Sequence, residues 1–153
     1  MVQSSPSPSP SPKVLGNLGV GPADSLDMSE FEHECLDVYQ AAIQFLVLAD
    51  TVAGSWPRGR GYLADQLRRA ASSISFNIAE GAGEFAPADK ARFYRTARRS
   101  ATESAAILDA CRVLSLTTDE SPAGRAVLLR IVAMLTAMVV KLSGSGSGSG
   151  SSD

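Results

Sequence analysis

The chain has 153 residues and a formal net charge of −2, which allows one small domain and does not favour a general attraction to polyanions. Two cysteines and a single histidine are too few for a four-ligand zinc site, so we expect reduced thiols and neither a metal nor another cofactor. The Ser/Pro-rich N-terminal residues have no apolar stretch, so we expect no signal peptide. The longest apolar run, residues 127–140, contains Arg130 and is expected to be too short to span a bilayer. These features predict a cytoplasmic protein without a membrane partner.

Both ends of the chain have the composition of disordered tails. Residues 1–28 contain an SPSPSPSP run, and alternating serine and proline stay extended and solvated. Residues 143–153 are almost entirely glycine and serine, which is typical of a flexible coil. We therefore expect the folded domain to occupy residues 29–142.

The first predicted helix begins at Ser29, which forms a capping box with Glu32, and it stops at Gly54 and Pro57. Apolar residues follow at alternating four- and three-residue steps and predict an inward face: Phe31, Cys35, Val38, Ala42, Phe45, Ala49 and Val52. A second stripe lies beside it, formed by Leu36, Tyr39, Ile43 and Leu46. Two apolar stripes predict a helix that is covered on two sides.

Three further helices follow. The second is expected over residues 62–79, and Gly81 and Gly83 are expected to cap it with a positive φ. The third runs from Pro87 to about residue 116, and the fourth runs from an N-cap at Ser121 to Leu142. No segment alternates with the period of a strand. The fold class is therefore all-α, an up-down-up-down four-helix bundle, and the almost uniformly apolar fourth helix predicts an oligomer.

Charge is segregated along the sequence. Residues 24–50 carry seven acids and no lysine or arginine, whereas residues 56–100 carry nine bases against four acids. A basic strip is predicted from residues of the third helix and of the loop before the second: Arg58, Arg60, Lys90, Arg92, Arg95 and Arg99. Such a strip suits contacts with backbone phosphates, although an ordinary solvated face has the same composition. Tyr94 beside it could stack a base, but packing in the core is expected more often.

A second set of polar residues is expected to form a buried or half-buried network between the second and third helices: Arg69, Asn77, Glu80, Arg98 and Glu103. We expect a structural role for this network rather than catalysis, because no pocket with a second acid or base group can be recognised. Phe76 lies next to these residues and suits either the core or a contact between subunits.

Two stretches resemble a known family: QLRRAASSISFNIAEGAGE at residues 66–84 and ARFYRTARRSATES at residues 91–104. They are similar to the small four-helix-bundle proteins encoded in ribosomal-RNA intervening sequences, a family shared with the accessory variability determinant of diversity-generating retroelements. The resemblance covers most of the chain from Glu34 to Leu142. The sequence departs from the family at Ser75 and Phe76, where Pro-Ser is usual, at Arg99, where Gly is usual, and in a first helix that is not basic.

The resemblance implies a ring-like homopentamer with no enzymatic activity. Its retroelement members bind nucleic acid and associate with a reverse transcriptase, so it also implies RNA or DNA and a reverse transcriptase or other protein as partners. We therefore expect a nucleic-acid-binding accessory protein that uses a basic face of the third helix. The alternative is a structural oligomer or scaffold that binds a protein partner and no nucleic acid.

Overall fold

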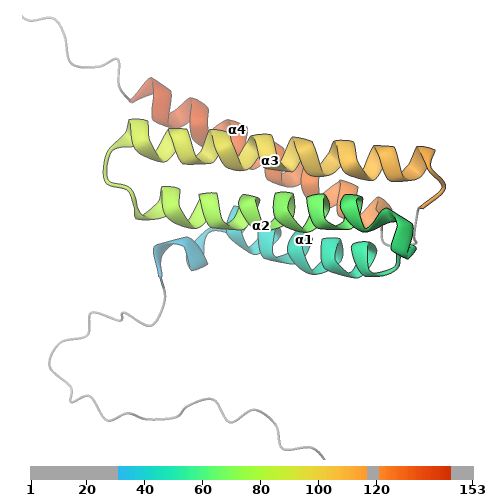
Figure 1. The fold of residues 1–153 in the computed structure, drawn as a ribbon. Coiled ribbons are helices and arrows are strands. Elements are labelled where there is room, and N and C mark those ends of the chain that lie inside the picture. Colours follow the sequence, from blue (N-terminus) through green and yellow to red (C-terminus); the bar gives the residue numbers. More distant parts are fainter. Residues whose placement is uncertain (1–30, 117–120, 146–153) are drawn as a thin grey trace, which may run out of the picture.

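The structure, a computed structural model, describes residues 31–116 and 121–145; the two predicted tails lie outside this part of the chain, apart from residues 143–145. Two short 3₁₀ helices and four α-helices follow one another along the chain (Figure 1). Their bounds are η1 Glu32–Cys35, α1 Asp37–Gly54, η2 Arg58–Arg60, α2 Gly61–Gly83, α3 Pro87–Val113 and α4 Ser121–Gly144. The helical domain therefore ends slightly beyond the predicted boundary at Leu142.

The four α-helices form an antiparallel bundle. Each packs on the next in the sequence, and α4 also packs on α1, which closes the bundle (Figure 1). The structure confirms the predicted all-α four-helix fold. Because it contains a single chain, the expected oligomer stays a prediction.

The beginning of the first helix differs from the prediction. Ser29 lies outside the described residues, and the first turn is the separate η1, in which the Glu34 carboxylate accepts a hydrogen bond from the Phe31 backbone N–H at 2.6 Å. Leu36 then takes an extended conformation, with ψ 124°, before α1 begins at Asp37. Phe31 and Cys35 consequently lie outside the inward face of α1 and are exposed.

The rest of the predicted pattern of the first helix is confirmed. The members of the inward stripe that belong to α1 are buried: Val38, Ala42, Phe45, Ala49 and Val52. All four residues of the second stripe are half-buried. The helix ends at Gly54, as predicted. Apolar periodicity therefore located the helix correctly wherever the backbone stays helical.

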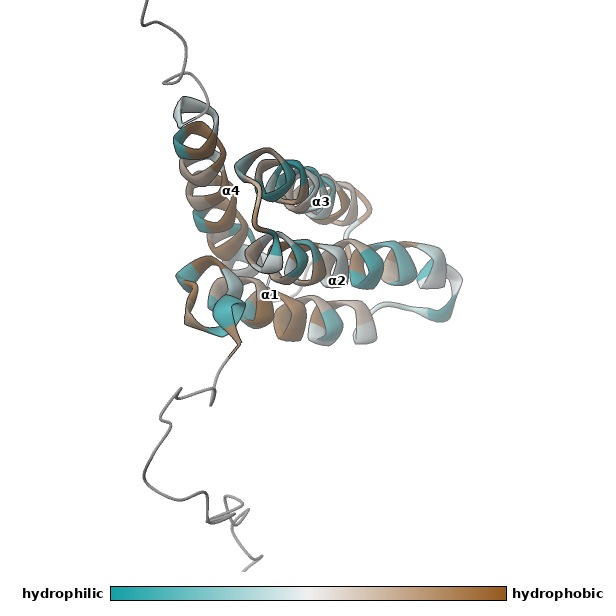
Figure 2. Cartoon of the chain, turned by 90° about the vertical axis from the view of Figure 1, so that its left-hand side faces the viewer, coloured by the Kyte–Doolittle hydropathy of each residue, from teal (hydrophilic) through white to brown (hydrophobic). Residues whose placement is uncertain are grey.

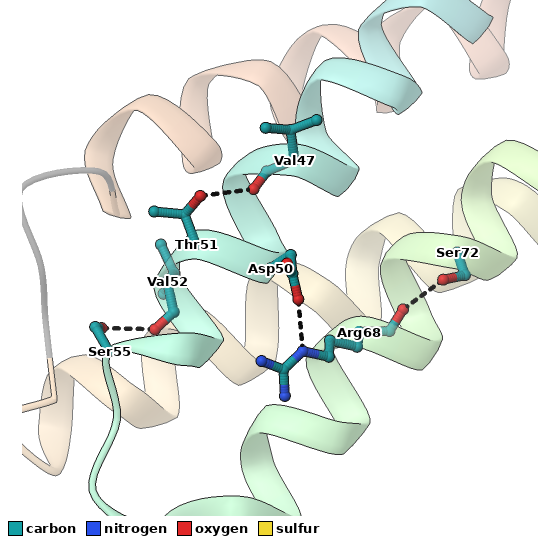
Figure 3. A network of polar contacts seen from close by, with 7 residues as sticks. All are labelled: Val47, Asp50, Thr51, Val52, Ser55, Arg68 and Ser72. Atoms are coloured by element: carbon teal, nitrogen blue, oxygen red, sulfur yellow. Dashed lines mark hydrogen bonds and ion pairs between the residues drawn. The ribbon is translucent and has the colours of Figure 1, made fainter.

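A polar contact joins α1 to α2 near the C-terminal end of α1 (Figure 3). The Arg68 Nε atom of α2 donates to the Asp50 Oδ1 atom at 2.7 Å, and the two side chains are 40% and 70% exposed. An exposed pair of this kind stabilises a fold by only about 0–1 kcal/mol. Beyond the helix, the Trp56 Nε1–H donates to the Leu116 carbonyl oxygen at 2.9 Å, which ties the α1–α2 connection to the end of α3.

The predicted glycine cap of α2 is wrong. The helix continues through Gly81 to Gly83, and no glycine in the described residues has a positive φ. A Cβ atom built on Gly81 would lie 2.7 Å from Tyr94 Cε1 and 3.0 Å from Phe93 Cβ. Gly81 is therefore needed for the close approach of α2 and α3 rather than for a left-handed cap.

The end of α3 has the hydrogen bonds of a Schellman motif. The Leu116 N–H donates to the Cys111 carbonyl at 2.8 Å, and the Ser115 N–H donates to the Arg112 carbonyl at 3.2 Å. Ser115 has φ 58°, the positive value that this motif requires and that usually favours glycine.

The fourth helix is apolar on its outer side as well as on its inner side (Figure 2). Gly124, Val127, Leu128, Ile131 and Leu135 are buried, whereas Leu129 is 63% exposed and Val140 is 66% exposed. With 24 residues, α4 is long and apolar enough to cross a membrane by length and composition, so the expectation that its apolar run is too short is wrong. Such a test is weak evidence, because core helices of soluble proteins also pass it, and α4 packs on α1 and α3.

Candidate nucleic-acid interface

Two arginines of α3 extend towards α4. The Arg95 Nη2 atom lies 3.4 Å from the Ser143 hydroxyl, and the Arg98 Nη1 atom lies 3.4 Å from the Thr136 hydroxyl. The Thr136 hydroxyl itself donates to the Val132 carbonyl at 2.7 Å. Both arginines thus meet neutral hydroxyl groups at long hydrogen-bond distances, which leave most of their charge uncompensated.

Arg99 lies next to this pair. An open hollow of about 420 Å³ is lined by Arg98, Arg99, Thr102 and Val132. Within residues 121–145, α4 carries no aspartate or glutamate. We call Arg95, Arg98 and Arg99 the arginine seam; no ion pair in the described part of the chain involves them. Its charge is therefore available to an anion from outside the chain.

Further along α3 and α4, towards Asp109 and Arg125, the surface between the two helices becomes mainly apolar. A groove there is lined mainly by apolar side chains, among them Ala101, Ala105 and Leu129. At its far end the Arg125 Nη1 atom lies 2.9 Å from the Asp109 Oδ1 atom. This groove is thus mainly apolar, and the arginine at its far end is paired with a carboxylate, unlike those of the arginine seam.

Two other residues of the predicted strip are already engaged. The Lys90 Nζ atom donates to the Ala82 carbonyl at 2.8 Å, which satisfies a carbonyl near the C-terminal end of α2. The Arg92 guanidinium lies 4.6 Å from the centroid of the Phe93 ring, a cation–π distance. Arg92 is exposed, so it can still present its charge to solvent.

The structure does not bring Arg58 and Arg60 to this surface. Both belong to η2, which precedes the N-terminal end of α2, whereas Arg92 and Arg95 lie near the start of α3, beside the C-terminal end of α2 (Figure 1). The intervening helix α2 has 23 residues, so about 34 Å separates its two ends. The six predicted residues therefore do not form one continuous strip.

The predicted polar network between α2 and α3 is not formed. Arg69, Glu80 and Glu103 are exposed, and the Arg69 Nε atom contacts only its own helix, at the Asp65 carbonyl. Asn77 and Arg98 are half-buried, but Asn77 bonds within α2 and Arg98 bonds to α4. The expectation of a shared network was wrong because the two helices lie too close together for long side chains to fit between them.

Small hydroxyl groups connect α2 and α3 instead. The Ser73 and Ser100 Oγ atoms lie 2.9 Å apart, and the Asn77 Nδ2 atom donates to the Ser73 Oγ atom at 3.1 Å. Ser104 is fully buried, and its hydroxyl donates a hydrogen bond to the Ser100 carbonyl at 2.9 Å. The small residues at positions 70–73 predict a close approach of the second helix to its neighbour, and this contact confirms it.

Tyr94 is a core residue, so packing in the core, the more frequent alternative to stacking on a base, is confirmed. It is 4% exposed and lies against Gly81. Burial, together with the negative charge of Glu32, raises the pKa of Tyr94 above that of a free tyrosine. Its ring is therefore unavailable for stacking on a base.

The residue that the sequence reasoning did not place is Phe76. Its side chain is 63% exposed on α2, so it does not belong to the core of the single chain. Phe85, in the connection between α2 and α3, is 98% exposed. The resemblance leads one to expect Pro-Ser at positions 75–76. A phenylalanine at position 76, in place of a serine, was the sequence feature that could have indicated an exposed aromatic residue here.

Metal-ligating residues do not cluster in the described ranges. Within residues 31–116 and 121–145, no group of three or more His, Cys, Asp or Glu side chains could hold a metal ion. Cys111 is buried, and burial raises the pKa of its thiol, whereas Cys35 is exposed. The arrangement offers an anion-binding surface rather than a ligand set for a cation.

These features define a class: a small antiparallel four-helix protein with an arginine-lined surface between its last two helices. Residues 34–137 match the family described as 23S rRNA-intervening sequence protein. Since the match covers most of the chain, the protein belongs to this family. A comparison with curated proteins found no match.

Proposed function

We propose that this protein is a non-enzymatic, cytoplasmic accessory protein that binds nucleic acid through the arginine seam. The observation that carries the proposal is the gathering of Arg95, Arg98 and Arg99 along α4 without a carboxylate partner in the described residues. Guanidinium groups bind phosphate oxygens through paired, charge-assisted hydrogen bonds. The hydroxyl oxygens of Ser143 and Thr136 accept from Arg95 and Arg98 and hold these guanidinium groups beside α4.

The resemblance to the accessory determinant of retroelements supports the same function. Its members bind nucleic acid beside a reverse transcriptase, so a reverse transcriptase or another protein is a further proposed partner. A homopentameric ring would repeat the seam several times, and weak phosphate contacts would then add through avidity. The exposed apolar side of α4, with Leu129 and Val140, is available for contacts between the subunits of such a ring.

The same apolar surface favours the second candidate function, a scaffold that binds a protein partner and no nucleic acid. Burying exposed apolar area contributes about 25 cal/mol per Å², whichever protein supplies the other side. The scaffold function leaves the arginine seam unexplained, so we place it second.

The test is a pair of double variants with equal loss of charge. Arg95→Ala with Arg99→Ala removes two exposed guanidinium groups of the seam. Arg58→Ala with Arg60→Ala removes one exposed and one half-buried guanidinium group before the N-terminal end of α2. Binding of a fluorescein-labelled RNA is followed by anisotropy over a range of salt concentrations. The seam variant should bind at least about tenfold more weakly, and its slope of log K against log[salt] should fall by about two.

The η2 variant should keep the wild-type slope. Equal losses in the two variants would show a diffuse electrostatic attraction rather than a site. Unchanged binding in the seam variant would refute the assignment, and absence of RNA binding by the wild-type protein at low salt would favour the scaffold.

A further inference from the structure

We propose that the ligand is a single-stranded nucleic acid, one base of which stacks on the exposed ring of Phe76 while its phosphates lie over the arginine seam. This inference rests on the proposed function, because the seam supplies the phosphate contacts. It adds a base-contacting residue and distinguishes single strands from duplexes. Stacking on an aromatic ring tolerates any base, since every base has a π-face.

The position of Phe76 follows from two contacts between α2 and α3. The Ser73 hydroxyl lies 2.9 Å from that of Ser100, and Gly81 lies directly against Tyr94. Since the helices are antiparallel, counting three residues on from Ser73 or five back from Gly81 places Phe76 level with residues 97–99 of α3. Phe76 therefore lies at the same level along the bundle as Arg98 and Arg99, on the neighbouring helix.

The other exposed aromatic residues do not share this position. Tyr62 is 55% exposed but precedes Phe76 by 14 residues of the same helix, which is about 21 Å. Phe85 lies beyond the end of α2, in the connection to α3. The Phe93 ring is half-buried and has the Arg92 guanidinium over it. Phe31 of the η1 turn is 73% exposed, but its ring is stacked on His33 with the centroids 5.6 Å apart. Of these aromatic residues, Phe76 combines an open ring with the level of the seam.

The charges around Phe76 favour a single strand over a duplex. Glu80 lies one turn further along α2, and Glu103 lies one turn beyond Arg99 on α3; both are exposed. A duplex presents phosphates continuously and would meet these carboxylates. A single strand can turn its bases towards the α2–α3 surface and its phosphates towards the α3–α4 surface, where α4 carries no acid in residues 121–145.

The experiment compares a labelled single-stranded oligonucleotide with the same sequence as a duplex. Phe76→Ala should weaken binding of the single strand by about tenfold or more and change duplex binding by less than about twofold. Tyr62→Ala is the matched control, an exposed aromatic residue of the same helix away from the seam, and it should change neither. Phe76→Trp should preserve single-strand binding, and its fluorescence should be quenched on binding, above the constant signal of the buried Trp56.

Three results would overturn the inference. These are unchanged single-strand binding by Phe76→Ala, wild-type affinity for the duplex that equals or exceeds that for the single strand, and a change in solution mass of Phe76→Ala, which would make the ring a subunit contact. If the seam variant loses binding while Phe76→Ala keeps it, the inference fails and the proposed function stands. If the wild-type protein binds neither oligonucleotide, the proposed function fails as well.

Discussion

Replacing Gly81 by alanine tests the close approach of α2 and α3. The added Cβ atom would lie 2.7 Å and 2.9 Å from two carbon atoms of the Tyr94 ring and 3.0 Å from Phe93 Cβ. The Tyr94 ring is 4% exposed and cannot swing away into solvent. The two helices must therefore separate, or the ring must move within a packed core.

Two opposing effects set the magnitude. Overpacking a well-packed core costs about 1–3 kcal/mol, and two ring atoms below 3 Å place this site in the upper half of that range. Alanine is more favourable than glycine inside a helix by about 1 kcal/mol, which offsets part of the cost. We expect Gly81→Ala to lower the free energy of unfolding by about 1–2 kcal/mol, or the melting temperature by about 3–10 °C.

Gly83→Ala is the matched control, because a Cβ atom at Gly83, near the end of the same helix, would meet nothing within 4 Å. Urea and thermal denaturation followed by circular dichroism would measure both variants. Gly83→Ala should be neutral or slightly stabilising. If Gly81→Ala matched it, helix propensity would dominate at both sites, and the close contact with Tyr94 would not explain the glycine.

Two further substitutions test the backbone conformation of Ser115 at the end of α3 and the raised pKa of the buried Tyr94. Ser115→Gly should raise the free energy of unfolding by up to about 1 kcal/mol, because Ser115 has φ 58°, a value that favours glycine. Ser55→Gly is the control and should give no gain, because Ser55 has φ −83°. Equal changes of the melting temperature in the two variants would contradict this explanation. Burial and Glu32 raise the pKa of Tyr94, so the unfolded chain loses this proton first and stability should fall as pH rises above about 10. In urea denaturation, Tyr94→Phe should make the unfolding free energy depend less steeply on pH above about 10. The raised pKa of Cys111 should leave a smaller dependence of the same sign. A pH dependence equal to that of the wild-type protein would exclude Tyr94 as the group responsible.

Apolar periodicity was sufficient to predict the helices. In α2, the apolar residues Leu67, Ala70, Ile74 and Ile78 recur at helical spacing and are all buried. In α3, Ala97, Leu108 and Cys111 are buried, whereas Phe93 is half-buried and Leu114 is 40% exposed. The inward face of a helix is fixed by one repeating pattern along one segment, so it needs no knowledge of the neighbouring helix. The start of α3 was also predictable from a local signal, because proline at position 87 suits the first turn of a helix, and α3 begins there.

Local backbone breaks were harder to predict because they compete with that pattern. Phe31 and Cys35 continue the heptad of α1 in sequence, yet the extended backbone at Leu36 separates them from it. The hydrogen bond from the Phe31 N–H to the Glu34 carboxylate stabilises a separate turn just before this break. A capping signal at Glu34 was thus present in the sequence, two residues later than the predicted partner of Ser29, Glu32.

The candidate site could be predicted only in part, because its geometry depends on the distance between helices. The sequence identified Arg95 and Arg99 as members of a basic face, but it assigned Arg98 to a network with Asn77 and Glu80. That assignment needed room between α2 and α3 for long side chains. Small residues leave none, so Arg98 extends to α4 instead.

The same small-residue contact links the stability of the bundle to the proposed binding surface. Gly81, Ser73 and Ser100 hold α2 and α3 close together, which leaves no room between them for larger side chains, and Phe76 is exposed at the level of Arg99. A variant that separates the helices, such as Gly81→Ala, should therefore weaken single-strand binding even where the protein remains folded. Loss of binding in proportion to loss of stability would indicate simple unfolding, whereas a loss at temperatures well below the melting transition would show that helix spacing itself shapes the surface.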